Sequence, residues 1–414
     1  MAIQLQPVKG FRDLYPADKA LQNYVFDKLK AVASLYGFEN YDGPILEPIE
    51  LYLGKSSKEL VEEQTFKIKD KKDQTLVMRP EMTPSLARMI AQKANQLVFP
   101  LKLFNLGLRF RYEAPQKGRE REFYQADFDI LGTENILADA EILAAAVNIF
   151  LNLGATENDF VIYINSRTFV DRKLTELGIE NKKDIMSCID RKDKISREAF
   201  LESLKKASLN EKQIIDLVSF LESEIKPQDD EYFKKLFNIL KRYGIDQYFK
   251  INKNTVRGLD YYTGLVFEAK DLSGKINRAL LGGGRYDNLV SAYNPNIKVP
   301  GIGFATSDVI LLEFIKIINK APQLNPCPTK YLVTIFSQET LNDSIQILNK
   351  LRKQNISAEI YPDTEKKLDK QLKYADRNNI PYAVIAGPEE IQKGIVKVKD
   401  MKTGEQKEIN ISDL

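Results

Sequence analysis

The sequence predicts an α+β protein in which a β-rich domain is interrupted by a helical insertion and followed by a small α/β domain. Three observations lead to this prediction. Two long strand-like runs, 101–110 and 123–131, flank a polar stretch, and lysine- and leucine-rich helical spacing fills residues 166–250. Strands then alternate with helices from 330 to 386. A chain of 414 residues is long enough for two to four domains.

The first β-rich part begins with a helix. Apolar side chains recur about every 3.6 residues over 17–37, and Gly37 is a typical stop signal. A short strand is expected at 75–78 and a second helix at 138–153. The runs at 101–110 and 123–131 predict a long hairpin, and residues 114–119 form its basic tip, which we expect to be mobile.

Residues 166–250 show no clear strand and predict an all-helical insertion, with helices at 197–207 and 211–225. Strand-like runs return at 264–269 and 278–281, before a helix at 307–319. Three prolines between 321 and 328 indicate a linker. The predicted boundaries are therefore 1–165 and 251–320 for the two parts of the β-rich domain, 166–250 for the insertion, 321–328 for the linker and 329–414 for the last domain.

The C-terminal domain shows a regular alternation that is typical of parallel sheets. A polar hairpin around residues 402–404 is expected to close it. The predicted elements are strand 330–336, helix 338–354, strand 356–361, helix 364–378, strand 381–386 and hairpin 395–410.

The composition excludes several kinds of catalysis. The chain contains no histidine, so it has no Ser-His-Asp triad, no Cys-His dyad and no histidine-ligated metal. Its two cysteines, Cys188 and Cys327, cannot form a four-cysteine zinc site. Any chemistry must rely on arginine, lysine, carboxylates, amides, tyrosines and a hard metal bound through oxygen.

The net charge of +3 is too small to indicate a nucleic-acid-binding protein, although local basic patches are compatible with it. The N-terminal residues lack the apolar core of a signal peptide, and no run of about 18 apolar residues occurs. The two thiols suit a reducing compartment. These features predict a cytoplasmic protein that does not enter a membrane.

The predicted hairpin carries the first candidate site. Alternation places Phe123, Gln125, Asp127 and Asp129 on one face, and Arg111, if it lies opposite, would point a guanidinium into an acidic pocket. A solvated polar strand face with cross-strand ion pairs is the alternative. A phenylalanine beside glutamine and aspartate is an unusual solvent face, but it makes a sensible floor for a planar base and a polar amine.

Three further clusters contain side chains of the same kind. They are Arg-Pro-Glu-Met-Thr at 79–83, Arg-Gly-Leu-Asp-Tyr-Tyr-Thr-Gly at 257–264, and Leu-Gly-Gly-Gly-Arg-Tyr-Asp at 281–287. Glycine runs permit close backbone approach. Taken singly, each cluster is more often a turn than a site.

Together and in this order, these segments closely resemble the histidyl-tRNA synthetase family over nearly the whole chain. The resemblance starts at 9–13, and a first class II motif runs from Tyr36 through Pro44. The second motif is Phe-Arg-Tyr-Glu at 110–113 with Phe-Tyr-Gln at 123–125. The two histidine signatures lie at 257–262 and 282–287, and the tail from 384 to 406 looks like an anticodon-binding domain.

The resemblance implies a class II fold: an antiparallel sheet flanked by helices, a helical insertion and a C-terminal α/β anticodon-binding domain. It also implies a ligase that activates L-histidine with ATP to histidyl-adenylate, releases pyrophosphate, and transfers the histidyl group to the 3′ end of tRNA(His). Mg²⁺ is expected to neutralise the leaving pyrophosphate. A homodimer is expected, with the region of Pro44 at the interface.

The resemblance also assigns residues to roles. Arg257 and Arg111 are the expected catalytic residues: Arg257 stabilises charge on the α-phosphate, and Arg111 bridges the carboxylate and that phosphate. The expected histidine-binding residues are Glu81, Met82, Thr83, Arg111, Gln125, Asp129, Arg257, Tyr261, Tyr262 and Tyr286. The expected ATP-binding residues are Arg111, Glu113, Arg119, Arg121 and Phe123, and those that meet the tRNA acceptor end are Gln116, Lys117 and Arg119.

One position departs from the family pattern. Ile310 stands where the third class II motif normally ends in an arginine over the adenine, and we expect Arg119 or Arg121 to replace the missing charge. The departure keeps a second interpretation open, namely a synthetase-like regulatory subunit of ATP phosphoribosyltransferase that binds histidine without charging tRNA. That paralogue lacks an anticodon-binding domain, so the α/β unit after Pro328 counts against it. A class II synthetase for another amino acid is the third interpretation.

Overall fold

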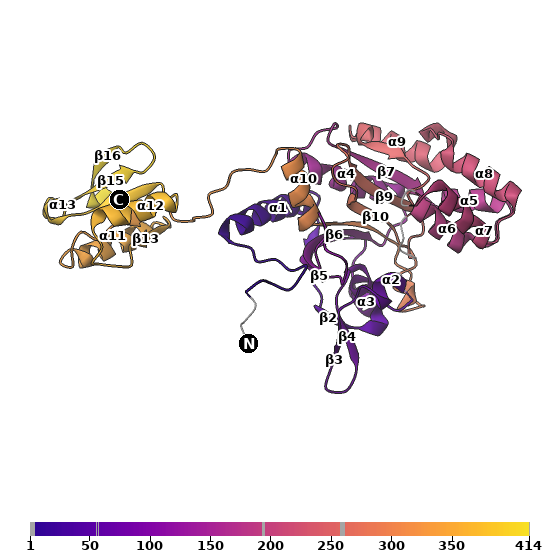
Figure 1. Cartoon of the computed structure of the whole chain (residues 1–414), viewed down its shortest axis with the longest axis horizontal. Coiled ribbons are helices and arrows are strands. Elements are labelled where there is room, and N and C mark those ends of the chain that lie inside the picture. Colours follow the sequence, from indigo (N-terminus) through magenta and orange to yellow (C-terminus); the bar gives the residue numbers. More distant parts are fainter. Residues whose placement is uncertain (1–4, 55, 57, 193–194, 257–260, 414) are drawn as a thin grey trace. The chain divides into compact units, whose positions relative to one another are not determined.

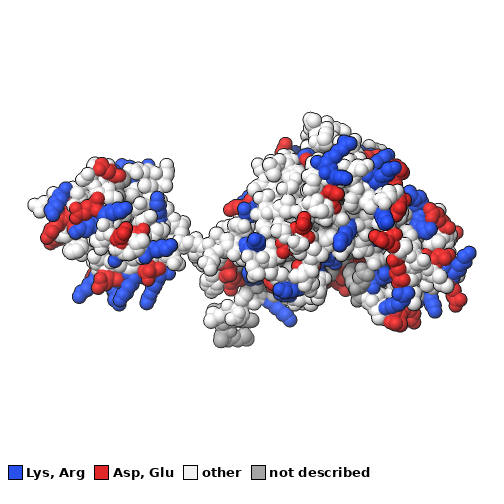
Figure 2. All heavy atoms as spheres, turned by 90° about the horizontal axis from the view of Figure 1, so that it is seen from above, with Lys and Arg blue, Asp and Glu red and all other residues white. Residues whose placement is uncertain are grey.

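A computed structural model describes residues 5–54, 56, 58–192, 195–256 and 261–413. The chain forms two compact units, whose boundary in the sequence lies between Pro322 and Gln323. Basic and acidic side chains are interleaved across the face shown in Figure 2, in keeping with 61 basic and 58 acidic residues. Within the described chain, no helix is long and apolar enough to cross a membrane.

The first unit is built on an eight-stranded sheet (Figure 1). Its inner pairs are antiparallel, whereas the edge pairs β1–β5 and β7–β8 are parallel. The sheet is therefore mixed: the expected antiparallel pairing joins its six inner strands, and a parallel strand is added at each edge. In spatial order the strands are β1 (Glu39–Asn40), β5 (Leu101–Phe110), β6 (Glu122–Leu131), β11 (Gly301–Ser307), β10 (Ala279–Arg285), β9 (Leu265–Asp271), β7 (Phe160–Ser166) and β8 (Phe249–Ile251).

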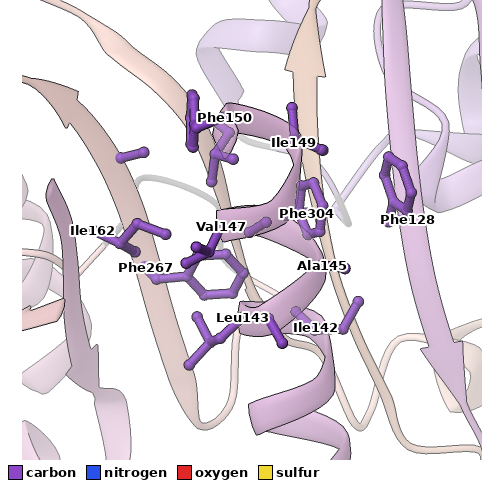
Figure 3. Close-up of a cluster of buried hydrophobic side chains, with 14 of the residues drawn as sticks. Phe128, Ile142, Leu143, Ala145, Val147, Ile149, Phe150, Ile162, Phe267 and Phe304 are labelled. Atoms are coloured by element: carbon purple, nitrogen blue, oxygen red, sulfur yellow. The ribbon is translucent and has the colours of Figure 1, made fainter. Parts of the chain in front are cut away.

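One face of this sheet is covered by an apolar core around helix α4 (Ile136–Asn152). Figure 3 shows α4 between side chains of the strands, with Phe128 and Phe304 on one side and Phe267 on the other. The helix is alanine-rich, which lets it lie close to the sheet. Helices α1 (Pro16–Leu35), α9 (Glu231–Arg242) and α10 (Asp308–Ile317) add their apolar stripes to the same core.

Strands β5 and β6 form the predicted long hairpin. Its pairing runs from Leu101 opposite Leu131 to Phe110 opposite Glu122, so alternate residues of β6 face the core and the opposite face. Asn135 caps α4 by accepting a hydrogen bond from the Leu137 amide at 2.9 Å.

The segment between β7 and β8 is helical, and Figure 1 shows α5 to α8 grouped together. These four helices enclose a core of their own, whereas α9 packs against α4. The expectation of no strand in 166–250 fails at both ends of the range, because β7 ends at Ser166 and β8 begins at Phe249. The four helices are α5 (Arg167–Glu176), α6 (Lys182–Arg191), α7 (Arg197–Lys206) and α8 (Glu211–Glu222).

The first unit also contains a small three-stranded antiparallel sheet. Its strands were predicted only in part, since 75–78 was the single run recognised. The elements are β2 (Leu46–Pro48), β4 (Thr75–Met78) and β3 (Lys67–Lys69), together with α2 (Lys58–Glu62) and α3 (Thr83–Lys93).

The second unit contains a five-stranded sheet in the order β13-β12-β14-β15-β16. Strand β12 pairs in parallel with both β13 and β14, and β15 and β16 form the closing antiparallel hairpin, which confirms the predicted α/β fold. The elements are β12 (Tyr331–Val333), α11 (Leu341–Lys353), β13 (Ala358–Ile360), α12 (Leu368–Arg377), β14 (Tyr382–Ile385), α13 (Pro388–Gln392), β15 (Ile395–Asp400) and β16 (Gln406–Asn410).

Candidate active site

A cavity of about 540 Å³ lies on the face of the large sheet that α4 does not cover. Strands β6, β9, β10 and β11 supply its floor, and the hairpin tip and the loop before β9 supply its rim. The predicted residues that line it are Glu81, Thr83, Arg111, Glu113, Arg119, Phe123, Gln125, Asp129, Tyr261, Tyr262 and Tyr286. Residues from four separate sequence segments therefore meet in one cavity.

Asp129 is the central acid of the cavity. The Tyr286 hydroxyl donates a hydrogen bond of 2.5 Å to its Oδ1. Burial, reinforced by the nearby charge of Asp127, raises the pKa of Asp129 to about 8. Gly303 lies opposite it on β11, and a Cβ at Gly303 would overlap the Asp129 carboxylate. A glycine is required here because the acid occupies the space of its side chain.

Glu81 is a second buried acid in this part of the cavity. It accepts hydrogen bonds from the Ser56 hydroxyl at 2.5 Å and the Tyr261 hydroxyl at 3.0 Å. Burial raises the pKa of Glu81 despite these donors and the charge of Arg111. The Tyr261 and Tyr262 rings lie 5.0 Å apart, centre to centre. This acidic and phenolic region, defined by Glu81, Asp129, Tyr261 and Tyr286, is called the amino-acid end below.

Asp127 lies between the two acids but is already paired. Arg109, which is fully buried, donates to Asp127 at 2.8 Å and to the Asn105 side chain at 2.6 Å. Gln125 donates to the other Asp127 oxygen at 2.7 Å. Asp129 has no such cation within hydrogen-bonding distance in the described chain. On the predicted acidic face, Asp127 is therefore neutralised by Arg109, whereas Asp129 can still accept a hydrogen bond from a ligand.

The other region of the cavity is cationic. Arg111 donates from Nε to the Pro80 carbonyl at 2.9 Å, and its guanidinium lies 5.5 Å from the centre of the Phe123 ring. Arg119 forms an ion pair with Glu113. These four side chains define the nucleotide end of the cavity: an aromatic ring able to stack on a base, beside fixed cations able to bind phosphate.

Some predicted residues do not line this cavity. Met82 is buried, and its sulfur lies 3.7 Å from Nη1 of Arg79. Arg121 donates to the Glu113 carbonyl at 3.0 Å, and its guanidinium lies 4.0 Å from the Tyr112 ring centre. Arg121 is therefore held outside the lining of the cavity in which it was expected to bind ATP. Arg257 lies outside the described residues.

The hairpin tip packs against α10, and the two border an open surface hollow of about 430 Å³. Gln116 and Lys117 line this hollow, and Lys117 pairs with Glu313 of α10 at 2.8 Å. Gly118 has a left-handed φ of 75° and lies directly against the Ile310 side chain. Ile310, at the position of the missing arginine, lines the first cavity and is buried.

Five charged residues that line the first cavity were missed in the sequence: Glu59, Glu120, Asp190, Glu268 and Arg278. Arg278 immediately precedes β10, and Glu268 lies on β9. Arg278 follows a polar turn and belongs to no alternating or helical pattern, so nothing in the sequence identifies it as a site residue. Only the cross-sheet pairing, which the sequence does not reveal, brings it next to the hairpin.

The mixed sheet with an acid-lined and arginine-lined cavity is consistent with the catalytic domain of a class II aminoacyl-tRNA synthetase. A histidyl-tRNA synthetase family model matches residues 10–308, and an anticodon binding domain model matches 330–414. The chain belongs to the histidyl-tRNA synthetase family.

Individual relatives agree with this assignment. Histidine–tRNA ligase of Leptospira biflexa is 34% identical over 418 residues, covering 98% of this chain and 95% of the relative. The ligase of Thermoplasma volcanium is 35% identical and covers 100% and 98%. The crystal structure of histidyl-tRNA synthetase from Nostoc sp. PCC 7120 has a TM-score of 0.81 at 25% identity, covering 99% of this chain and 97% of that one.

Proposed function

We propose that this protein is a histidine–tRNA ligase. It activates L-histidine with ATP, releases pyrophosphate, and transfers the histidyl group to the 3′ end of tRNA(His). The observation that carries the proposal is the single cavity in which an amino-acid end and a nucleotide end adjoin. Family membership supports the same function.

Histidine recognition is assigned to the amino-acid end. Asp129 and Tyr286 suit an imidazole ring, which can donate from its nitrogens. Glu81, Thr83 and Gln125 suit the α-amine, because carboxylate, hydroxyl and amide oxygens accept its hydrogen bonds. Such a site rejects isosteres, because an analogue without the hydrogen bonds leaves buried polar groups unpaired.

Adenylate formation is assigned to positioning and charge. Phe123 would stack under the adenine, and Glu113 would help to place the nucleotide. Arg111 would bridge the histidine carboxylate and the α-phosphate, and Arg257 would stabilise charge as the carboxylate attacks. Fixed cations in a water-poor site act on charge that develops in the transition state.

Mg²⁺ is the expected metal, and the residues fit it in part. Among the described residues, no group of three or more histidine, cysteine or acidic side chains could hold a metal ion. Glu113 and Glu268 both line the cavity, and Mg²⁺ is typically bound by one or two carboxylates plus phosphate oxygens. When bound with ATP, the ion would neutralise the leaving pyrophosphate.

We assign the acceptor end of tRNA(His) to the hairpin tip at Gln116, Lys117 and Arg119, and the anticodon to the domain from 329 to 414. The predicted homodimer, the cytoplasmic location and the boundaries given for the domains are parts of the same proposal. The anticodon-binding family match at 330–414 supports the tRNA partner.

The test is ATP–pyrophosphate exchange with a panel of amino acids, followed by charging of tRNA(His) transcript. Exchange that depends on histidine is expected. Exchange with a different amino acid, or none at all, contradicts the proposal. Absence of exchange with retained histidine binding would favour the regulatory-subunit interpretation, for which the loss of the motif 3 arginine at Ile310 is the relevant observation.

A further inference from the structure

Three arginines, Arg111, Arg119 and Arg278, line the cavity. Two of the acids that line it are already paired, Glu113 with Arg119 and Glu268 with Lys270. Arg278 makes no hydrogen bond or ion pair within the part of the chain that the structure describes. A half-buried guanidinium with all of its donors unused is a ready partner for an anion.

The neighbours of Arg278 identify the kind of anion. Burial lowers the pKa of Arg278, and the positive charges of Arg119 and Arg111 lower it further, whereas Glu113 opposes them. All of these charges belong to the nucleotide end. A ligand with several negative oxygens would relieve the repulsion among the three guanidiniums, and an arginine fork matches phosphate in a bidentate manner.

The position of Arg278 along the nucleotide follows from Arg111. Because the histidine carboxylate attacks the α-phosphate, that phosphate must lie near Arg111, between the two ends of the cavity. Arg278 lines the same cavity, and the charges that act on it, those of Arg119, Glu113 and Arg111, belong to the nucleotide end. This placement suits the phosphates that follow the α-phosphate.

The other candidates for this role are weaker. Ile310 contributes only aliphatic surface, and Arg121 is held by the Glu113 carbonyl and the Tyr112 ring. Arg119 lines the cavity, but its guanidinium is engaged with Glu113. Arg278 comes from the turn between β9 and β10, a different element from the hairpin and from α10.

We propose that Arg278 binds the terminal phosphates of ATP and supplies the cation that Ile310 does not. This inference rests on the proposed function, since it presumes that the triphosphate enters this cavity. It differs from the expectation that Arg119 or Arg121 partly replaces the missing charge.

The test compares Arg278→Ala with Lys275→Ala. Lys275 lies in the same turn, and its replacement by alanine removes the same charge. Its side chain, however, is exposed and does not line the cavity. Binding of ATP, pyrophosphate, AMP and histidine is measured directly for each protein. Arg278→Ala should weaken ATP and pyrophosphate binding about tenfold to a hundredfold. AMP and histidine binding should stay within about twofold, and Lys275→Ala should change none of the four.

Arg278→Lys guards against a folding defect in the alanine variant, because it keeps the charge and the stem. It should retain part of the preference for ATP over AMP, since an ammonium is a point charge without the planar fork. If Arg278→Ala and Arg278→Lys keep the parent's ratio of ATP to AMP affinity, the inference is overturned.

The binding ratio and the exchange assay separate the two proposals. A parent protein that exchanges with histidine while Arg278→Ala keeps the full ATP preference refutes the inference and leaves the function intact. A parent protein without exchange, whose ATP preference nevertheless depends on Arg278, refutes the function and supports the phosphate site.

Discussion

The two faces of the large sheet differ completely, although the same strands build both. On the core face one cross-sheet row contains Phe104, Phe128, Phe304, Gly283 and Phe267, and the rings of Phe128 and Phe304 stack 4.9 Å apart. One residue further along each strand, the row on the cavity face contains Asn105, Asp127, Ala305, Gly282 and Glu268.

This difference separates stability from function within a few ångströms. The core face buries aromatic and aliphatic surface, which favours folding. The cavity face buries charges, which costs free energy unless each is paired. The Arg109–Asp127 pair keeps one charge of this face satisfied, whereas Asp129 is left available for a ligand. Substitutions on the two faces should therefore affect different measurements.

The largest effect is expected for Arg109→Ala. This change leaves Asp127 buried without its cation, and breaking such a pair typically costs about 3–5 kcal/mol. Urea unfolding should show this loss in the free energy of unfolding. The double variant Arg109→Leu/Asp127→Leu, which removes both charges, should be more stable than Arg109→Ala. A double variant that is less stable would show that the pair is not the source of the cost.

The second effect is on binding. Asp129→Asn should weaken histidine binding about tenfold to a hundredfold, because the amide offers one acceptor oxygen fewer and leaves a buried polar group without its partner. The KM for ATP should change little, because Asp129 lies at the amino-acid end. Steady-state exchange kinetics with each substrate varied in turn will measure the split. Equal changes in both KM values would assign Asp129 to the fold and not to recognition.

The free energy of unfolding should depend on pH because of the titration of Asp129. Its pKa is raised from 3.8 to about 8 by burial, so the folded protein binds the proton more tightly than the unfolded chain. The resulting stability is fully present below about pH 4 and is lost as the pH rises through about 8. The slope is at most about 1.4 kcal/mol per pH unit. In thermal unfolding without ligand, Asp129→Asn should lack this contribution, and parallel profiles for the two proteins would contradict it.

The smallest effect is expected on the core face. Ile302 is fully buried on β11, directly next to Gly303 in the chain. Ile302→Val removes one methylene group and should lower the free energy of unfolding by about 0.5–1.5 kcal/mol. The KM values for histidine and ATP should remain those of the parent. A change in either KM would show that the two faces are coupled.

The part of the site that could be predicted from the sequence consists of residues on strand β6, where alternate side chains point to the same face of the sheet. The hairpin placed Phe123, Gln125, Asp127 and Asp129 on one face, and this is where they lie. Arg121 has the same parity but precedes the first residue of β6, so the two-residue period does not extend to it. Its side chain turns instead toward Gly10 and Tyr112.

Long-range pairing could not be predicted from local pattern. Strand β11 carries glycines at 301 and 303 and lacks the usual strand composition, yet it is paired on both sides. Its position decides which residues of β10 meet the hairpin, and thereby brings Arg278 into the cavity. The buried cation Arg109 was also missed, because nothing in the sequence distinguishes a buried arginine from a solvated one.

The contact between Gly118 and Ile310 bears on how this site can change in evolution. A Cβ at Gly118 would come within 2.7 Å of Ile310 Cδ1, and the left-handed φ of 75° at Gly118 independently favours glycine there. A substitution at 310, including the arginine of the family pattern, therefore changes a side chain that contacts the hairpin tip. We expect such a change to be accommodated by a shift of the tip as well as at residue 310 itself.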